Sequence, residues 1–182
     1  IIKSCEALDK IGGELLVIHP GYYAINKEDT SKRIKQNLRK SLTKIESEGL
    51  GVKLGIETTA KDKQFGSVDE IREVCEYLDY EVQPVLDFAH IHASTYGSLK
   101  NKKKFEEILN TFEGKVNTFH FHIACVKHKD GEEVHPLSLD AKKPDYKLLI
   151  EELKSINSDS RLILESPDPL KDVQKIKSWA SE

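Results

Sequence analysis

Five short apolar runs, each followed by a stretch with helical apolar spacing, set the strongest limit on the fold of this chain. The apolar runs lie at 15–19, 52–57, 82–88, 116–123 and 161–165. The amphipathic stretches that follow them lie at 27–48, 67–78, 102–112, 146–156 and 170–179, and residues 1–11 look like the end of a further helix. Strands that alternate with amphipathic helices indicate a parallel sheet covered by helices.

The length of the chain narrows the choice between the parallel architectures. The chain has no Gly-rich phosphate fingerprint, which disfavours a nucleotide-binding sheet. A complete (β/α)8 barrel takes about 250 residues, whereas this chain has 182 residues and five units. We therefore predict an α/β fold, a (β/α)8 TIM barrel of which this chain covers the last five β/α units. Residues 1–182 then form one domain, and we expect either that this domain is the C-terminal part of a barrel or that an N-terminal portion is missing from this sequence.

Composition and charge indicate which cellular compartment and which binding partners to expect. The net charge of −3 gives no overall attraction to nucleic acid, so any DNA contact needs a local basic surface. No apolar run approaches the roughly 18–20 residues of a membrane span, so no membrane association is expected. Cys5, Cys75 and Cys125 are widely spaced and odd in number. They favour reduced thiols in a cytoplasmic protein over a disulfide framework or a cysteine zinc site.

A side chain that can bind a metal ion stands at or beside the C-terminal end of every predicted strand. These residues are His19, Glu57, Asp87, His122 and Glu165. In a parallel barrel all these strand ends lie on the face that carries the active site. Imidazoles and carboxylates without thiolates suit Zn²⁺ or Mn²⁺. One such residue alone is more simply a capping or hydrogen-bonding group, but the set predicts a metal site.

Histidines in the predicted loops extend this set. His90 and His135 lie in loops above the same face, and the candidates together exceed the needs of one tetrahedral ion. A cluster bridged by a carboxylate is the natural outcome, and multi-metal sites commonly serve phosphoryl hydrolysis. His92 either points into the groove or faces solvent, His120 is more simply a core or supporting histidine, and we expect His128 at the surface.

Several short motifs follow one another along the chain: His19-Pro-Gly, Gly55-Ile-Glu57, Phe65-Gly-Ser, Asp87-Phe-Ala-His90, His122, His135-Pro-Leu and Leu162-Ile-Leu-Glu165. In their order and spacing these motifs resemble endonuclease IV, the AP endonuclease family 2, and two of them are especially similar to archaeal members. The resemblance implies a barrel with three zinc ions, of which this chain holds two to three, with Mn²⁺ as an alternative. It also implies cleavage of DNA on the 5′ side of abasic sites in base excision repair. Duplex DNA containing abasic sites is the expected partner, and we expect a monomer.

The resemblance also assigns roles to residues. Glu57 becomes a bridging carboxylate that shares one ion with His19, and Glu57 and Glu165 become the catalytic residues. Asp87, His122 and Glu165 complete a second ion. The third ion is implied to bind His90, His135 and Glu133, the last of which stands where the family usually has an aspartate.

Two other interpretations remain open. A sugar isomerase or epimerase of the xylose-isomerase-like barrels also arranges Glu, Asp, His and Glu around one Mn²⁺ or Mg²⁺, so Glu57, Asp87, His122 and Glu165 do not discriminate. His19, His90 and His135 are surplus for such an isomerase and favour the phosphodiesterase. Nothing in residues 1–18 supplies the additional metal histidine that the family has on an earlier strand. The third interpretation is a non-catalytic barrel remnant.

Overall fold

Five parallel strands in sequence order form the central sheet of the protein. The computed structural model describes residues 1–24, 26–61 and 63–182. The strands are β1 (Leu15–Ile18), β3 (Lys53–Glu57), β5 (Gln83–Asp87), β6 (Thr118–Ile123) and β9 (Asp159–Leu164). Each strand pairs in parallel with the next one along the chain. The order never reverses, as it does in a doubly wound sheet, so the five predicted β/α units of a TIM barrel are confirmed.

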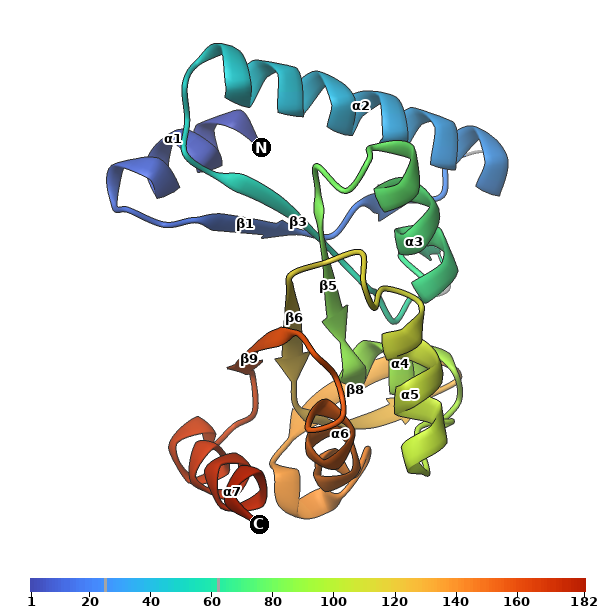
Figure 1. Cartoon of the computed structure of the whole chain (residues 1–182). Helices are drawn as coiled ribbons and strands as arrows, with labels where there is room; N and C mark the ends of the chain where they lie inside the picture. Colours follow the sequence, from blue (N-terminus) through green and yellow to red (C-terminus); the bar gives the residue numbers. More distant parts are fainter. Residues whose placement is uncertain (25, 62) are drawn as a thin grey trace.

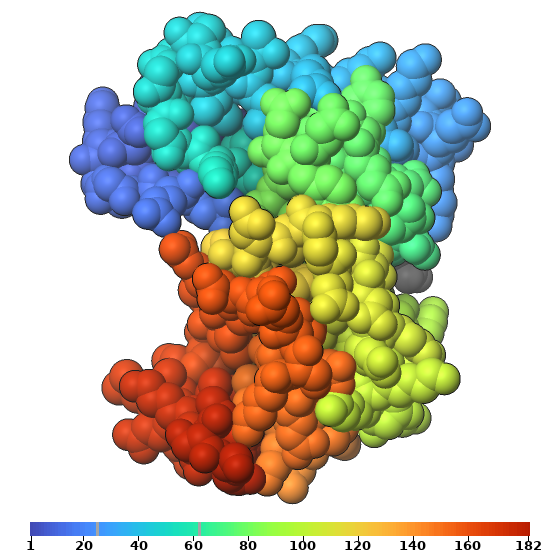
Figure 2. Space-filling model, viewed as in Figure 1, coloured from blue at the N-terminus to red at the C-terminus, as the bar shows by residue number. Residues whose placement is uncertain are grey.

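Helices cover one face of this sheet. They are α1 (Ile2–Lys10), α2 (Lys27–Ser47), α3 (Val68–Tyr77), α5 (Lys102–Asn110), α6 (Tyr146–Leu153) and α7 (Pro169–Ser181). Local signals set their starts: Asn26 caps α2, and Ser67 and Glu70 form a capping box at α3. Figure 1 shows α2, α3, α5 and α6 arranged around the outer side of the sheet. Figure 2 shows the N-terminal segments (blue) and the C-terminal segments (red) at opposite ends of the molecule, with the middle of the chain between them.

The two faces of the sheet differ in burial. The helix-facing side chains, such as Leu54, Ile56, Phe119 and Phe121, are fully buried in the main core. Side chains that point to the opposite face alternate with these along each strand. One of them, Ile163 on β9, is 51% exposed. That second face corresponds to the interior of a barrel, and it ends in the predicted metal-binding residues.

Two of the predicted loops contain a helix or a hairpin of their own. The segment after β5, expected to be a loop, is the short helix α4 (Phe88–Ser94), and Asp87 caps it by accepting a hydrogen bond from the His90 amide at 2.8 Å. The predicted loop that carries His135 is instead part of the antiparallel hairpin of β7 (Cys125–Lys129) and β8 (Glu132–Leu137), followed by the 3-10 helix η1 (Leu139–Ala141). Asp130 and Gly131 form the hairpin turn with positive φ angles, and Asp-Gly is a strong hairpin signal. The loop prediction was therefore wrong at both places.

The hairpin packs on α4 across a layer of small side chains. Ala89 and Ala93 on α4 meet Ala124 and Val126 at the start of β7, and Ala60 completes this buried cluster. A two-stranded ribbon of β2 (Gly21–Tyr22) and β4 (Gln64–Phe65) lies beyond the ends of β1 and β3. Within the described part of the chain, no helix has the length and apolar character needed to cross a membrane.

Candidate metal centre

Glu57, at the end of β3, is the centre of the cluster at the strand ends. Its side chain is buried, and each carboxylate oxygen faces one imidazole. His122 Nδ1 lies 2.8 Å from Oε1, and His19 Nε2 lies 3.1 Å from Oε2. Burial acts to raise the pKa of Glu57, but the hydrogen bonds with His122 and His19 outweigh it and lower the pKa to about 2. Glu57 is therefore an ionised carboxylate that joins two imidazoles.

One possible ligand group lies on the side of Glu57 that faces β6. Each of its four residues offers a ligand atom, and these atoms lie within 4.8 Å of one another; the residues are Glu57, Asp87, His122 and Glu165. His122 Nδ1 lies 3.3 Å from Glu165 Oε1. Register explains the convergence, because Asp87 pairs directly with His122 on the neighbouring parallel strand. Glu165 follows β9, the next strand of the sheet.

A second possible ligand group shares Glu57 with the first. It consists of His19, Glu57 and His90, again with ligand atoms within 4.8 Å of one another. Two residues that the sequence did not indicate hold its imidazole rings. The Gln64 side-chain nitrogen lies 3.2 Å from His19 Nδ1, and His90 Nδ1 lies 2.8 Å from the Thr58 carbonyl oxygen. Such partners set the orientation of metal-binding histidines, but no sequence spacing marks them.

His90 also contacts Glu133 of the hairpin. Its Nε2 lies 3.1 Å from Glu133 Oε2. Burial acts to lower the pKa of His90, but the hydrogen bond with Glu133 and the charge of Asp87 raise the pKa to about 9. The same hydrogen bond lowers the pKa of Glu133. The structure thus brings together His90 and Glu133, two of the three residues expected at the third ion.

His135, the remaining member of that trio, lies on the other face of the hairpin. Lys127 pairs with His135 whereas its neighbour His128 pairs with Glu133, so Val134 has no partner. Paired residues share a face and consecutive residues alternate, which places Glu133 and His135 on opposite faces. His135 is exposed and belongs to neither ligand group found among the described residues. The bulge is the physical reason that the Glu133-Val-His135 spacing does not bring both side chains to one site.

The donor atoms of both groups fit a divalent cation. They combine imidazole nitrogens with carboxylate oxygens, the set that Zn²⁺ and Mn²⁺ accept. The three cysteines are buried and belong to neither group. Glu57 is common to both groups, so the arrangement can hold two ions that share one carboxylate.

Comparisons with known proteins agree with this architecture. A family model described as the xylose isomerase-like TIM barrel matches residues 1–182. The chain belongs to this family. One relative is an uncharacterized protein of Methanocaldococcus jannaschii, MJ0133, which is 35% identical over 173 residues, 92% of this chain. The chain spans 62% of the length of that relative.

Solved structures of several xylose isomerase-like barrels share the fold. A D-tagatose 3-epimerase-like protein has a TM-score of 0.73 at 18% identity, over 98% of this chain and 66% of its own. Endonuclease IV from Thermus thermophilus has a TM-score of 0.68 at 18% identity, over 97% of this chain and 65% of its own. The IolI protein, with a bound zinc atom, has a TM-score of 0.55 at 19% identity, over 98% of this chain and 64% of its own. These identities show the fold alone.

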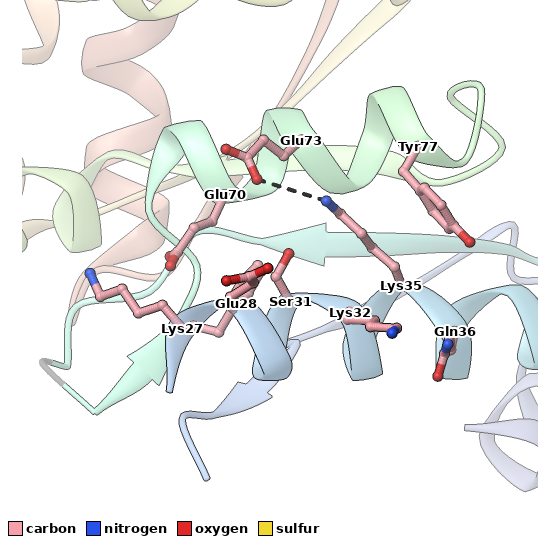
Figure 3. Close-up of a pocket in the computed structure, with 10 residues that line it drawn as sticks. Lys27, Glu28, Ser31, Lys32, Lys35, Gln36, Glu70, Glu73 and Tyr77 are labelled. Carbon is pink, nitrogen blue, oxygen red and sulfur yellow. Dashed lines mark ion pairs between the residues drawn. The ribbon is translucent and has the colours of Figure 1, made fainter. Parts of the chain in front are cut away.

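A groove of about 590 Å³ between α2 and α3 is separate from this centre. Figure 3 shows Lys35 of α2 reaching toward Glu73 of α3, and their Nζ and Oε2 atoms are 3.7 Å apart. Lys35 also lies over the Tyr77 ring, at 5.7 Å from its centroid. None of the strand-end residues lines the groove. Its central charges are paired across the two helices, which accounts for the groove as part of their packing.

Asp87→Asn is expected to stabilise the metal-free protein above pH 6. Burial raises the pKa of Asp87 from 3.8 to about 6. The unfolded chain then releases this proton at lower pH than the folded chain, so stability is lost as the pH rises from 3.8 through 6. Asparagine cannot ionise, so the variant does not lose stability in this way. Its side-chain oxygen can still cap α4. The gain is at most about 3 kcal/mol, because the pKa of Asp87 rises from 3.8 to about 6 and one pKa unit corresponds to about 1.4 kcal/mol.

Thermal unfolding with a chelator present, between pH 4 and pH 8, measures this effect. The two proteins should be equally stable near pH 4 and diverge toward pH 8. Asp159→Asn makes the same chemical change at an exposed aspartate and serves as the matched control. A variant less stable than the parent protein at pH 8 would show that the buried charge of Asp87 is compensated in the fold.

Proposed function

We propose that this chain carries a divalent-metal-dependent phosphodiesterase centre of the endonuclease IV type, which hydrolyses DNA on the 5′ side of abasic sites. The observation that carries the proposal is the sharing of Glu57 between two ligand groups. A single ion would already be satisfied by Glu57, Asp87, His122 and Glu165. The histidines His19 and His90 are then surplus, unless a further ion binds beside the first.

Divalent ions held here would polarise a phosphodiester, activate water at neutral pH and neutralise charge on the leaving oxygen. The residues around them have separate tasks. Glu57 lies between the two groups, while Thr58 and Gln64 hold the His90 and His19 rings. The Glu165 side chain is 50% exposed, whereas those of Glu57 and Asp87 are 8% and 4% exposed. Glu165, which follows the edge strand β9, is thus the most exposed of these three carboxylates in this chain, and we assign it the task of accepting a proton from water.

A sugar epimerase is the second candidate. The group of Glu57, Asp87, His122 and Glu165 is complete without any further histidine, and it offers the carboxylates that one-ion sugar chemistry uses. Epimerases are also among the proteins with the same fold. This candidate assigns no task to His19 and His90, which is why we place it second.

An assay with two substrate classes tests the proposal. The purified protein, supplied with Zn²⁺ or Mn²⁺, is incubated with a duplex that contains one abasic site, and in parallel with a panel of ketoses. We expect incision on the 5′ side of the abasic site, leaving a 3′-hydroxyl, and loss of incision with EDTA. A duplex of the same sequence without the abasic site is the control. Sugar interconversion without incision would select the epimerase instead.

A further inference from the structure

A second pocket lies on the other side of α4 from the metal centre. His90 and His92 are two positions apart on this helix, so their side chains leave it about 200° apart. His90 contacts Glu133, while the His92 ring packs edge-on against His128 with ring centroids 5.4 Å apart. Glu133 and His128 are themselves paired across the hairpin. The hairpin therefore contributes one side chain to the metal centre and one to this pocket.

The pocket has an excess of positive charge. Its volume is about 510 Å³, and its polar lining includes Lys100, Lys142, Lys143, His92 and His128. No carboxylate within 1–24, 26–61 or 63–182 forms an ion pair with the three lysine ammonium groups. Asp145 also lines the pocket, but its Oδ1 accepts a hydrogen bond from the Lys147 amide at 3.2 Å. The balance of charge favours an anion.

An unpartnered imidazole lies in the wall of this pocket. His92 is 6% exposed, and its Nδ1 is buried with no hydrogen-bond partner among the described residues. A buried polar atom without a partner costs free energy, and a bound water or ion is one explanation for such an atom. Gly97, at φ +80°, lies close to both rings, because a Cβ there would be 3.3 Å from His128 Nε2 and 3.6 Å from His92 Nε2. These two Nε2 atoms, which are distinct from the unpartnered Nδ1, therefore lie near one point beside Gly97.

The remaining walls are apolar and aromatic. Leu99, which is 2% exposed, and Leu148 line the pocket together with Tyr96. The Tyr96 side chain is 68% exposed and lies against Gly131 at the hairpin turn. An exposed aromatic ring beside a cationic wall suits a flat ring that stacks and a phosphate that pairs with lysines. A volume of this size also exceeds what phosphate alone needs.

We propose that this pocket binds the phosphate group of a small phosphorylated ligand of the nucleoside monophosphate class, separately from the metal centre. Lys100 and Lys143 pair with the phosphate oxygens, and His92 and His128 donate hydrogen bonds to them. The base stacks on Tyr96. Nothing in this site requires the strand-end ligands, so binding here does not depend on the proposed hydrolysis.

Titration with inorganic phosphate and with adenosine 5′-monophosphate, used as probes, tests the site. Calorimetry gives the affinities, and histidine-ring NMR signals show where each probe binds. We expect both probes to shift the His92 and His128 signals, and the nucleotide to bind more tightly. The double variant Lys100→Ala/Lys143→Ala should weaken nucleotide binding by about tenfold or more, since charged hydrogen bonds are lost. Tyr96→Ala should weaken the nucleotide and leave phosphate unchanged.

Two controls separate the pocket from other sources of binding. Lys40→Ala removes an exposed lysine on α2 and should bind both probes like the parent protein. Glu57→Gln disrupts the metal centre and should still bind the nucleotide in the pocket. The proposal is overturned if neither histidine signal shifts, or if the double lysine variant binds like Lys40→Ala. A nucleotide that binds no more tightly than phosphate overturns the assigned ligand class.

Discussion

Glu57→Gln is expected to lower the proposed phosphodiester hydrolysis by more than about a hundredfold while the fold is retained. Loss of a partner that only supports a metal ligand typically costs about 10–100-fold, and Glu57 is shared by both ligand groups. Glutamine has nearly the same shape but no charge, so it weakens both groups at once. The fold should survive because Glu57 contacts His19 and His122 at the sheet end and is not part of the apolar core.

Metal content and activity together measure this effect. By elemental analysis, the parent protein should hold more than one ion of zinc or manganese per chain, and Glu57→Gln should hold fewer. Circular dichroism checks that the secondary structure is unchanged. Glu14→Gln makes the same chemical change at a side chain that is 74% exposed and pairs with Arg161, and it should retain full activity. Unchanged hydrolysis by Glu57→Gln would remove this residue from the centre of the mechanism.

Phe121→Ala is expected to cost about 3–5 kcal/mol of unfolding free energy. Phe121 is fully buried on the helix-facing side of β6, with its ring centroid 5.4 Å from that of Phe88 and 5.5 Å from that of Phe119. Phe88 in turn packs against Phe105 of α5 at 5.3 Å. Alanine leaves a cavity in the middle of this aromatic cluster, which joins the sheet to α4 and α5.

Urea unfolding followed by circular dichroism measures the loss. Leu170→Ala is the control, because Leu170 is 79% exposed on α7, and surface changes of this kind stay within about 0.5 kcal/mol. A loss below about 1 kcal/mol for Phe121→Ala would mean that the neighbouring rings close the cavity. Phe121 precedes His122, a residue of the candidate metal centre, so a shift of β6 in the variant should also weaken binding of Zn²⁺ there.

Short apolar runs and helical apolar spacing in the sequence predicted where the strands lie and where they end. Alternation of apolar runs with amphipathic helices located five parallel strands, and parallel strands necessarily bring their C-terminal ends together. His19, Glu57, Asp87, His122 and Glu165 could therefore be placed at one edge of the sheet from the sequence. Helix α4 escaped prediction because it has only seven residues, too few to show a helical period. The hairpin was not predicted, although the sequence contains the Asp130-Gly131 dipeptide that forms its turn.

The sequence by itself determined which residue types reach the open end of the sheet, because strand period and parallel topology are local and repetitive. Only the tertiary structure decided which of these residues, and which loop residues, come together in one site. Packing of the hairpin on α4 brought Glu133 to His90 and His128 to His92, and a single unpaired residue turned His135 to the opposite face. These contacts join segments far apart in the sequence through side-chain packing, for which the chain carries no periodic signal.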